Sequence, residues 1–190
     1  MTQFSRAFCA LPLATLACLA CAVPTQADSP DRSAAKFASG SGNIIYLAAG
    51  LGLPLLSDGA NGTRHSLRVA DSLLVSLAIT EGLKGLTREK RPDSNAHDSF
   101  PSGHATAAFA VATMESSLHP RQAPLWYLGA TLISASRVRL HRHTTGDVLV
   151  GAAIGAGVSR LEIAQPHGLL LSPFITPDGR GMGFQMSRGL

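Results

Sequence analysis

Five apolar stretches of helical length, separated by strong breakers, most constrain what this chain can fold into. They are 11 to 17 residues long and contain many small residues, a combination that favours helices over strands. Runs rich in Gly, Pro, Asn and Ser separate them. The sequence therefore predicts an all-α fold, a compact helical bundle. The stretches are Ile44–Leu56, Leu67–Leu83, Ala105–Leu118, Leu125–Ala135 and Val148–Val158.

Small residues in the last stretch indicate how closely its helix can pack. Gly151 and Gly155 are four residues apart, a spacing used for close helix contacts in membranes and equally suited to a soluble core. Most stretches are shorter than the roughly 20 residues that cross a bilayer. Asp71 and Glu81 also interrupt the second stretch. We therefore favour a soluble or peripheral bundle, with contact to a membrane surface, over an embedded one.

Residues 1–27 have the pattern of an export signal. Arg6 is the only charge, residues 7–23 are apolar or small, and residues 25–27 offer a cleavage point. An uncleaved anchor helix and a lipoprotein signal at Cys21 are the alternatives. All three cysteines lie in this segment, so the cleaved domain could use neither disulfides nor cysteine-ligated metals. We expect an exported, periplasmic protein.

The remaining chain divides by composition into three parts. We expect a flexible lead-in over residues 28–42, a helical domain over residues 43–164, and a C-terminal hairpin or tail over residues 165–190. The tail predicts two short strands around a turn at residues 177–181.

Charge and aromatic content argue against a nucleic-acid partner. The chain has 16 Lys and Arg against 12 Asp and Glu, a formal net charge of +4 with no long basic cluster. Aromatic residues make up only 5%, too few for a platform on which bases stack. The oligomeric state is not readable from the sequence.

The first candidate motif is a cation pair around a helix end. Lys84 and Arg91 are seven residues apart, and Pro92 biases Arg91 towards an extended conformation. The spacing therefore places Lys84 in the last turns of a helix and Arg91 on the loop beyond it. By itself the signal is weak, because cations near a helix C-terminus often serve only the helix dipole.

The second candidate motif is Pro101-Ser102-Gly103-His104, directly before an apolar helix. Free N–H groups at a helix start favour an anion, and Gly103 would let the anion approach the backbone closely. His104 would then stand beside the anion as a proton donor. A Ser that only caps the helix, with an incidental His, is the alternative reading.

The third candidate motif joins a fixed cation to a histidine and a carboxylate. His143 and Asp147 are four residues apart, so a helix beginning near residue 143 would place both on one face. A carboxylate on one imidazole nitrogen raises the basicity of the other, as a nucleophilic histidine requires. Arg137 supplies a forked cation suited to phosphate oxygens.

Together the motifs resemble the signature of the type 2 phosphatidic acid phosphatase superfamily, which includes class A acid phosphatases and vanadium haloperoxidases. The pattern is K-x6-R-P, P-S-G-H and S-R-x5-H-x3-D, and the resemblance covers roughly residues 44–162. The matching residues are Lys84 with Arg91-Pro92, Pro101 to His104, and Ser136-Arg137 with His143 and Asp147.

The resemblance implies a metal-independent phosphatase that needs no cofactor. His143 would form a phosphohistidine and Asp147 would orient it. His104 would protonate the leaving oxygen and then activate water. The phosphoryl oxygens would be held by Lys84, Arg91, Ser102, Gly103 and Arg137.

The substrate and two alternatives stay open. Family substrates range from small phosphate monoesters to phosphatidic acid, lipid A and polyprenyl diphosphates. A vanadium haloperoxidase and a non-catalytic phosphate- or lipid-binding module would use the same scaffold. Outside the motifs we expect His97 and Asp98 to be solvated loop residues, with positions bordering the pocket as the alternative. We expect His65, His119 and His167 to occupy surface or packing positions.

Overall fold

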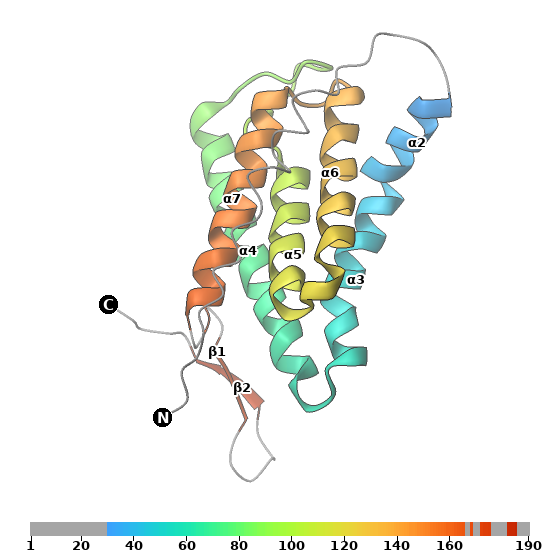
Figure 1. The fold of residues 1–190 in the computed structure, drawn as a ribbon. Coiled ribbons are helices and arrows are strands. Elements are labelled where there is room, and N and C mark those ends of the chain that lie inside the picture. The colour runs from blue at the N-terminus through green and yellow to red at the C-terminus, as the bar shows by residue number, and fades with distance from the viewer. Residues whose placement is uncertain (1–29, 166–167, 169–171, 176–181, 186–190) are drawn as a thin grey trace.

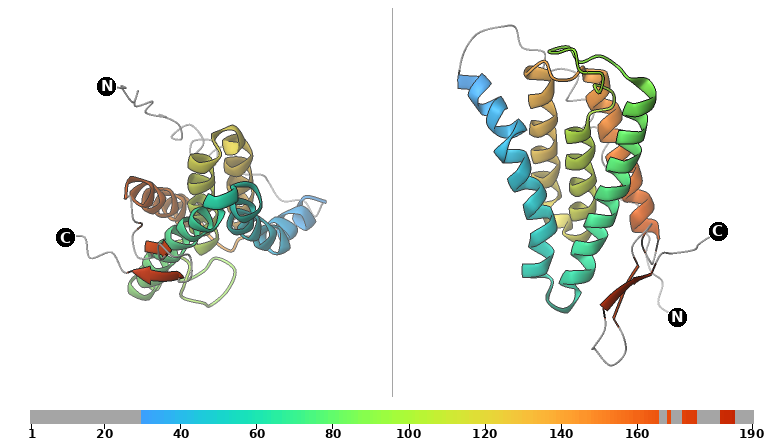
Figure 2. Two further views of the ribbon diagram at one scale, coloured as in Figure 1. Left: turned by 90° about the horizontal axis from the view of Figure 1, so that it is seen from below. Right: turned by 180° about the vertical axis from the view of Figure 1, so that it is seen from behind.

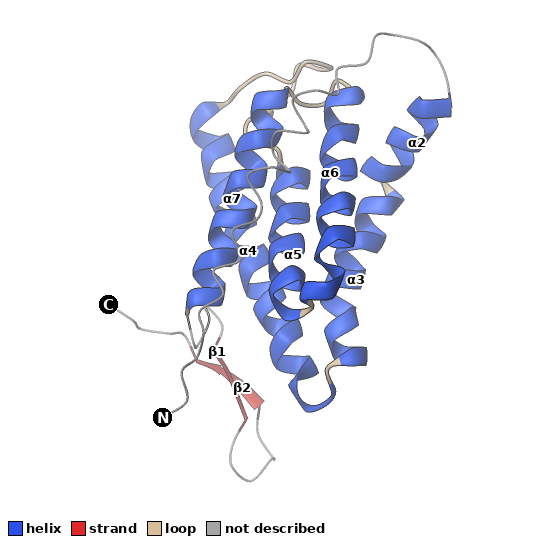
Figure 3. Ribbon diagram, viewed as in Figure 1, coloured by secondary structure: helices blue, strands red, loops and turns tan. Residues whose placement is uncertain are grey.

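The computed structural model describes residues 30–165, 168, 172–175 and 182–185, and nearly all of them are helical (Figures 1 and 3). The predicted all-α bundle is confirmed, and each of the five apolar stretches forms the body of one helix from α3 to α7. Two short 3₁₀ turns, Gly59–Asn61 and Pro120–Gln122, lie between helices. The helices are α2 (Pro30–Ser39), α3 (Ser41–Ser57), α4 (Gly62–Thr87), α5 (Gly103–Leu118), α6 (Ala123–Arg139) and α7 (Thr145–Ala164).

Helix α5 is the centre of the bundle. It packs against α3, α4, α6 and α7, and the right-hand view of Figure 2 shows it between α6 and α4. Every residue from Ala105 to Glu115 is buried, which its Ala-rich and Thr-rich sequence allows because small side chains let neighbours approach on all faces. The predicted phosphate-binding loop therefore leads directly into the most enclosed helix.

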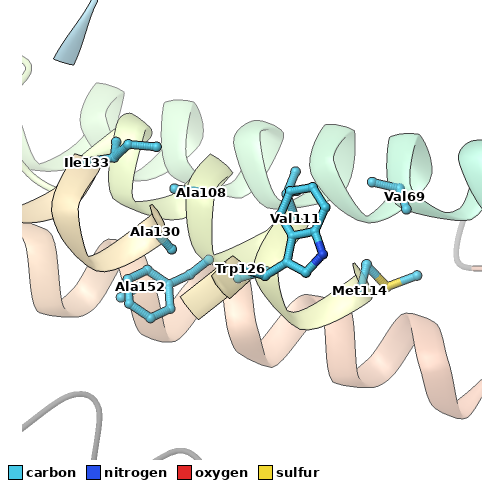
Figure 4. Close-up of a cluster of buried hydrophobic side chains, with 10 residues drawn as sticks. Val69, Ala108, Val111, Met114, Trp126, Ala130, Ile133 and Ala152 are labelled. Carbon is cyan, nitrogen blue, oxygen red and sulfur yellow. The ribbon is translucent and has the colours of Figure 1, made fainter. Parts of the chain in front are cut away.

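Large side chains fill the space around α5 (Figure 4). Phe109, Val111 and Met114 from α5 meet Val69 from α4 and Trp126 from α6. Burying each such side chain contributes about 1.5–3 kcal/mol. This core joins the helices into one rigid frame below the candidate site.

Gly151 lets α7 approach the start of α5. A Cβ added at Gly151 would lie only 2.5 Å from the Ser102 carbonyl oxygen, so no larger residue fits without a shift. The predicted close packing of small residues is therefore seen between α7 and α5. Its consequence is that the loop carrying Ser102 rests directly on the first turns of α7.

The lead-in expected over residues 28–42 differs from what the structure shows. Residues 30–39 form α2, and α3 already begins at Ser41. Ala35 is buried, and the Arg139 Nη2 atom of α6 lies 2.8 Å from the Asp31 carboxylate. Polar composition suggested a loop, but contacts with α6 that no local pattern reveals hold this segment as a helix.

The C-terminal strands β1 (Ser172–Ile175) and β2 (Met182–Gln185) pair antiparallel, with Ser172 opposite Gln185. This agrees with the predicted hairpin, whose expected turn at residues 177–181 lies outside the described residues. Figure 1 shows the strands beyond the C-terminal end of α7, at the end of the bundle opposite the predicted motifs.

Among the described residues no single helix is long and apolar enough to cross a membrane. Helices α2 and α3 taken together pass that test by length and composition, with a bend of 41° between them.

Candidate active site

The predicted site residues gather at one end of the bundle. This is the end where α4 and α6 finish and α5 and α7 begin, at the top of Figure 1. Three segments far apart in the sequence thus meet, because antiparallel helices place alternate ends together. The residues are Lys84, Arg91, Ser102, Gly103, His104, Arg137, His143 and Asp147.

His143 lies two residues before α7 and is only 3% exposed. Its Nδ1 atom lies 2.8 Å from the Ser99 carbonyl oxygen and 3.5 Å from the Asp147 carboxylate. A carbonyl can only accept, so Nδ1 carries the hydrogen and Nε2 keeps its lone pair when the ring is neutral. The ring is therefore anchored mainly by Ser99, and Asp147 is the second, longer contact.

Asp147 holds the surroundings of His143 in place. The Thr144 backbone N–H donates to Asp147 Oδ2 at 2.9 Å, and the Asp147 N–H donates back to the Thr144 hydroxyl at 3.2 Å. This reciprocal pair is a capping box that starts α7. The Ser99 hydroxyl donates to the same carboxylate oxygen at 2.6 Å. Asp147 thus orients His143 largely through Ser99, a route that the four-residue spacing did not indicate.

Burial and nearby cations keep His143 neutral. Burial lowers its pKa, and the positive charges of Arg137 and Arg91 lower it further. The hydrogen bond to Ser99 and the charge of Asp147 oppose this without reversing it. At neutral pH the Nε2 lone pair is consequently available for attack.

His104 occupies the first turn of α5 and is also held neutral. Burial and the charge of Arg137 lower its pKa to about 4, although a hydrogen bond to the Ser39 backbone opposes the shift. The charges of His143 and Lys84 add to the lowering, which shows that the groups lie within electrostatic reach of one another. Bringing a phosphate anion to this place would raise the pKa again.

The loop before α5 presents the groups expected of an anion site. Ser102 is the N-cap residue of α5 but its side chain caps nothing, and its buried hydroxyl has no hydrogen-bond partner among the described residues. Its backbone N–H donates to the Asp147 carbonyl at 3.0 Å. A Cβ at Gly103 would lie 3.4 Å from the Lys84 Nζ atom, so the loop borders the end of α4.

Lys84 and Arg91 each have a carboxylate partner that the sequence analysis did not assign. The Lys84 Nζ atom lies 2.7 Å from Glu81 Oε1. Arg91 donates through Nε and Nη2 to both oxygens of Asp98, at 2.7 and 2.8 Å. Asp98 is a half-exposed loop residue, as expected, and it also borders the pocket, the alternative that the sequence left open. The hydrogen bonds from Arg91 also lower the Asp98 pKa.

Arg137 is the most enclosed of the three predicted cations, at 6% exposed. Its Nη1 atom donates to the Ser39 hydroxyl at 2.5 Å, a neutral partner from α2. Its buried Nε atom has no hydrogen-bond partner within the described residues. Burial and the charges of Arg142 and Arg91 lower its pKa to about 10. A buried cation with an unused donor is a strong attractor for a phosphoryl oxygen.

A cavity of about 690 Å³ adjoins the Lys84 side of this region. Charged side chains line it, but most of the lining surface is apolar and comes from their carbon stems. The lining residues are Glu81, Lys84, Gly85, Arg88, His97 and Asp98.

No group of three or more His, Cys, Asp or Glu side chains with metal-binding geometry occurs in the part of the chain that the structure describes. The predicted independence from metal and cofactor stays a prediction.

The sequence analysis missed three residues that support the site, Thr144, Ser99 and Ser39. Only Thr144 had a sequence pattern that could have revealed it. Thr144 followed by Asp147 is a capping-box pattern that can be read from sequence. Ser99 and Ser39 act through backbone carbonyls or through contacts between distant helices. Such contacts leave no mark in residue type or spacing.

The family comparison agrees with these motifs. The PAP2 superfamily model matches residues 66–169, more than half of the 190-residue chain. The chain belongs to the PAP2 superfamily. Helices α5, α6 and α7 of this PAP2 domain lie entirely within the matched residues, whereas α2 and α3 precede them.

The PAP2 domain is also similar to a curated protein. It is 34% identical over 102 residues to the lipid A 1-phosphatase of Porphyromonas gingivalis, covering 52% of this chain and 22% of that protein. The match therefore spans less than a quarter of the relative's length. No solved structure matches the chain.

Proposed function

We propose that this PAP2 chain is an exported, metal-independent phosphatase that hydrolyses lipid phosphates or related phosphate monoesters through a phosphohistidine. The observation that carries the proposal is the anchoring of His143. Its Nδ1 hydrogen is held by the Ser99 carbonyl, and the neutral ring stands among cations with Nε2 free. This is the state that a nucleophilic imidazole requires.

In the first step the His143 Nε2 lone pair attacks phosphorus. A P–N bond forms while the bond from phosphorus to the leaving oxygen breaks. The leaving oxygen takes a proton from His104, which gains it when the anionic substrate raises the low pKa of the ring. The products of this step are phospho-His143 and the free alcohol.

In the second step water releases the phosphate. Neutral His104 takes a proton from water as the water oxygen attacks phosphorus. The P–N bond breaks and its electron pair returns to Nε2, which restores His143. Inorganic phosphate leaves, and the proton on His104 is available for the next leaving group.

The cations supply the charge stabilisation that both steps need. Arg137 offers its unused buried Nε donor, and Ser102 offers its free hydroxyl. Glu81 and Asp98 hold Lys84 and Arg91 at the rim without entering the buried part of the site. The N-terminus of α5 adds backbone donors to the phosphoryl oxygens.

A lipid phosphate is the proposed substrate class, with contact to a membrane surface. The matched relative is by name a lipid A phosphatase. In addition, α3 exposes several large apolar side chains, Ile44 at 67%, Ile45 at 61% and Leu56 at 87%. Together with the length and apolar composition of the α2–α3 pair, this exposure supports association with a lipid surface.

The test is hydrolysis by the purified protein of an aryl phosphate, phosphatidic acid, lipid A 1-phosphate and a polyprenyl diphosphate. We expect release of phosphate that survives a chelator and is inhibited by vanadate. Brief reaction with ³²P-labelled substrate should leave an acid-labile label that is absent from H143Q. Full activity of H143Q would contradict the mechanism. Phosphate binding without turnover would indicate a binding module, and halide oxidation after loading with vanadate would indicate a haloperoxidase.

A further inference from the structure

The joint between α2 and α3 reaches the buried cation of the candidate site. Ser39, the last residue of α2, accepts a hydrogen bond on its hydroxyl from Arg137 Nη1 at 2.5 Å. The Ser39 backbone also acts on the predicted acid, because it raises the pKa of His104 against the larger lowering by burial. A residue of α2 thus contributes to the site that α5, α6 and the loop before α7 form.

The chain bends directly after Ser39. The N–H of Gly40 turns back to the Lys36 and Phe37 carbonyls at 3.0 and 3.1 Å, and a bend of 41° separates α2 from α3. Ser39 therefore lies at the corner between the two helices, from which its hydroxyl reaches Arg137.

Two further contacts keep α2 against α6. Ala35 is buried at 6% exposed, and Asp31 pairs with Arg139 at 2.8 Å. The exposed Asp31 pair contributes little, because surface ion pairs are weak. Burial of Ala35 at the contact between helices is therefore the main determinant of where Ser39 sits.

We propose that Ser39 is a positioning residue for the phosphatase reaction, its hydroxyl holding the Arg137 fork so that the Nε donor stays available to a phosphoryl oxygen. The inference rests on the proposed function. It concerns a segment that precedes the PAP2-matched residues, so α2 completes a site whose other parts lie within them.

The predicted nucleophile and the buried cation are then anchored in the same way. His143 donates its Nδ1 hydrogen to the Ser99 carbonyl, which leaves Nε2 for the substrate. Similarly, Arg137 donates through Nη1 to Ser39, which fixes the guanidinium fork and leaves its Nε donor for a phosphoryl oxygen.

The hydroxyl is tested by a matched pair, S39V and S39T, which have nearly the same shape and differ in one hydroxyl. S39V should raise the inhibition constant of vanadate and the KM for an aryl phosphate about tenfold, as expected for losing a hydrogen bond to a charged group. S39T should stay close to the parent, because its hydroxyl can accept from Arg137. Equal constants for S39V and S39T would overturn this part of the proposal.

The placement of Ser39 by α2 is tested by lifting α2 from the bundle with A35R, with A34R as control because Ala34 is exposed. A35R should raise the inhibition constant of vanadate and the KM by about as much as S39V, because the Ser39 hydroxyl then no longer reaches Arg137. A34R should change neither constant. Equal constants for A35R and A34R would overturn the role of α2 in placing Ser39.

The two proposals fail in different ways. If the parent protein hydrolyses none of the four substrates, the proposed function fails. If the parent is active but S39V matches S39T and A35R matches A34R, only the role of Ser39 fails. Circular dichroism on each variant identifies one that has lost its fold, and if A35R unfolds, the S39V and S39T pair decides.

Discussion

The two ends of the bundle use histidine in opposite ways. At the site, His104 and His143 stand among cations, and both pKa values are lowered, chiefly by burial. At the other end, where α3 and α5 finish and α4 begins, His119 lies between two carboxylates. Its Nε2 atom is 2.9 Å from Asp58 and its Nδ1 atom 2.9 Å from Glu115. Burial would lower the pKa of His119, but the hydrogen bonds to both carboxylates raise it.

This difference shows which end is incomplete without an anion. In the distal cluster, defined as Asp58, His65, Glu115 and His119, carboxylates face the imidazoles directly. His65 lies 2.5 Å from Asp58, and its hydrogen bond is the main cause that lowers the Asp58 pKa. At the site, the Asp147 carboxylate lies farther from His143, at 3.5 Å, and is already held by Ser99 and Thr144. Glu81 and Asp98 pair with Lys84 and Arg91, and Arg137 has a hydroxyl as its side-chain partner. A phosphoryl group would supply the missing negative charge.

The largest expected effect comes from removing one histidine at each end. H143Q should lower kcat by at least about 10⁴-fold, because no other group can form the covalent intermediate. H119Q should keep kcat within about twofold, because His119 lies at the opposite end of the bundle. Steady-state kinetics on an aryl phosphate measures both. Comparable losses of kcat in the two variants would break the distinction between a catalytic and a structural end.

The next largest effect concerns the buried cation. R137K keeps a charge but loses the fork that holds Ser39 and offers Nε to the substrate. We expect kcat/KM to fall by about 10²-fold, in the range found for losing one donor to a developing negative charge. R142K changes an exposed cation paired with Asp93 and should have little effect. Should R142K prove as damaging as R137K, general positive charge rather than the buried fork would be the relevant property.

The pH dependence follows from the low pKa of His104. One proton must be shared between His104, with a pKa of about 4, and the phosphate ester, whose second pKa is about 6. Between these values the proton lies on the substrate and the His104 ring is neutral, so the titration of His104 and of the ester changes kcat/KM little there. Above about pH 6 that proton is lost, and kcat/KM should fall about tenfold per unit. A profile that rises from pH 6 to 8 would contradict His104 as the acid.

The sequence was sufficient to predict the helices and the meeting of the three motifs at one place. It was not sufficient to predict the contacts that hold the motifs there. Apolar periodicity located α3 to α7 because burial drives these helices, and residue type revealed His143, Arg137 and the loop at Ser102. Helix α2 was not predicted because it is polar and is held by tertiary contacts. Ser99 was not predicted because backbone carbonyls are chemically the same at every residue. Ser39 was not predicted because a contact between distant helices leaves no mark in the sequence. The distal cluster was only partly anticipated, since packing positions were expected for His65 and His119 without their carboxylate partners.

The smallest expected effect lies in stability at the distal end. His119 has a raised pKa, so its contribution is fully present below its unfolded value of about 6.5 and is lost as pH rises through the folded value. Asp58 has a lowered pKa, so its contribution is present above its unfolded value of about 3.9 and is lost as pH falls. H119Q should therefore lower Tm most between about pH 4 and 6.5, by roughly 2–4 °C, the scale of one net hydrogen bond. H97Q, at an exposed loop histidine bonded to the Arg88 carbonyl, is the control and should leave Tm unchanged. If H119Q lowered Tm equally at pH 5 and pH 9, the cluster would act through packing alone, and the contrast between the two ends would be one of shape rather than charge.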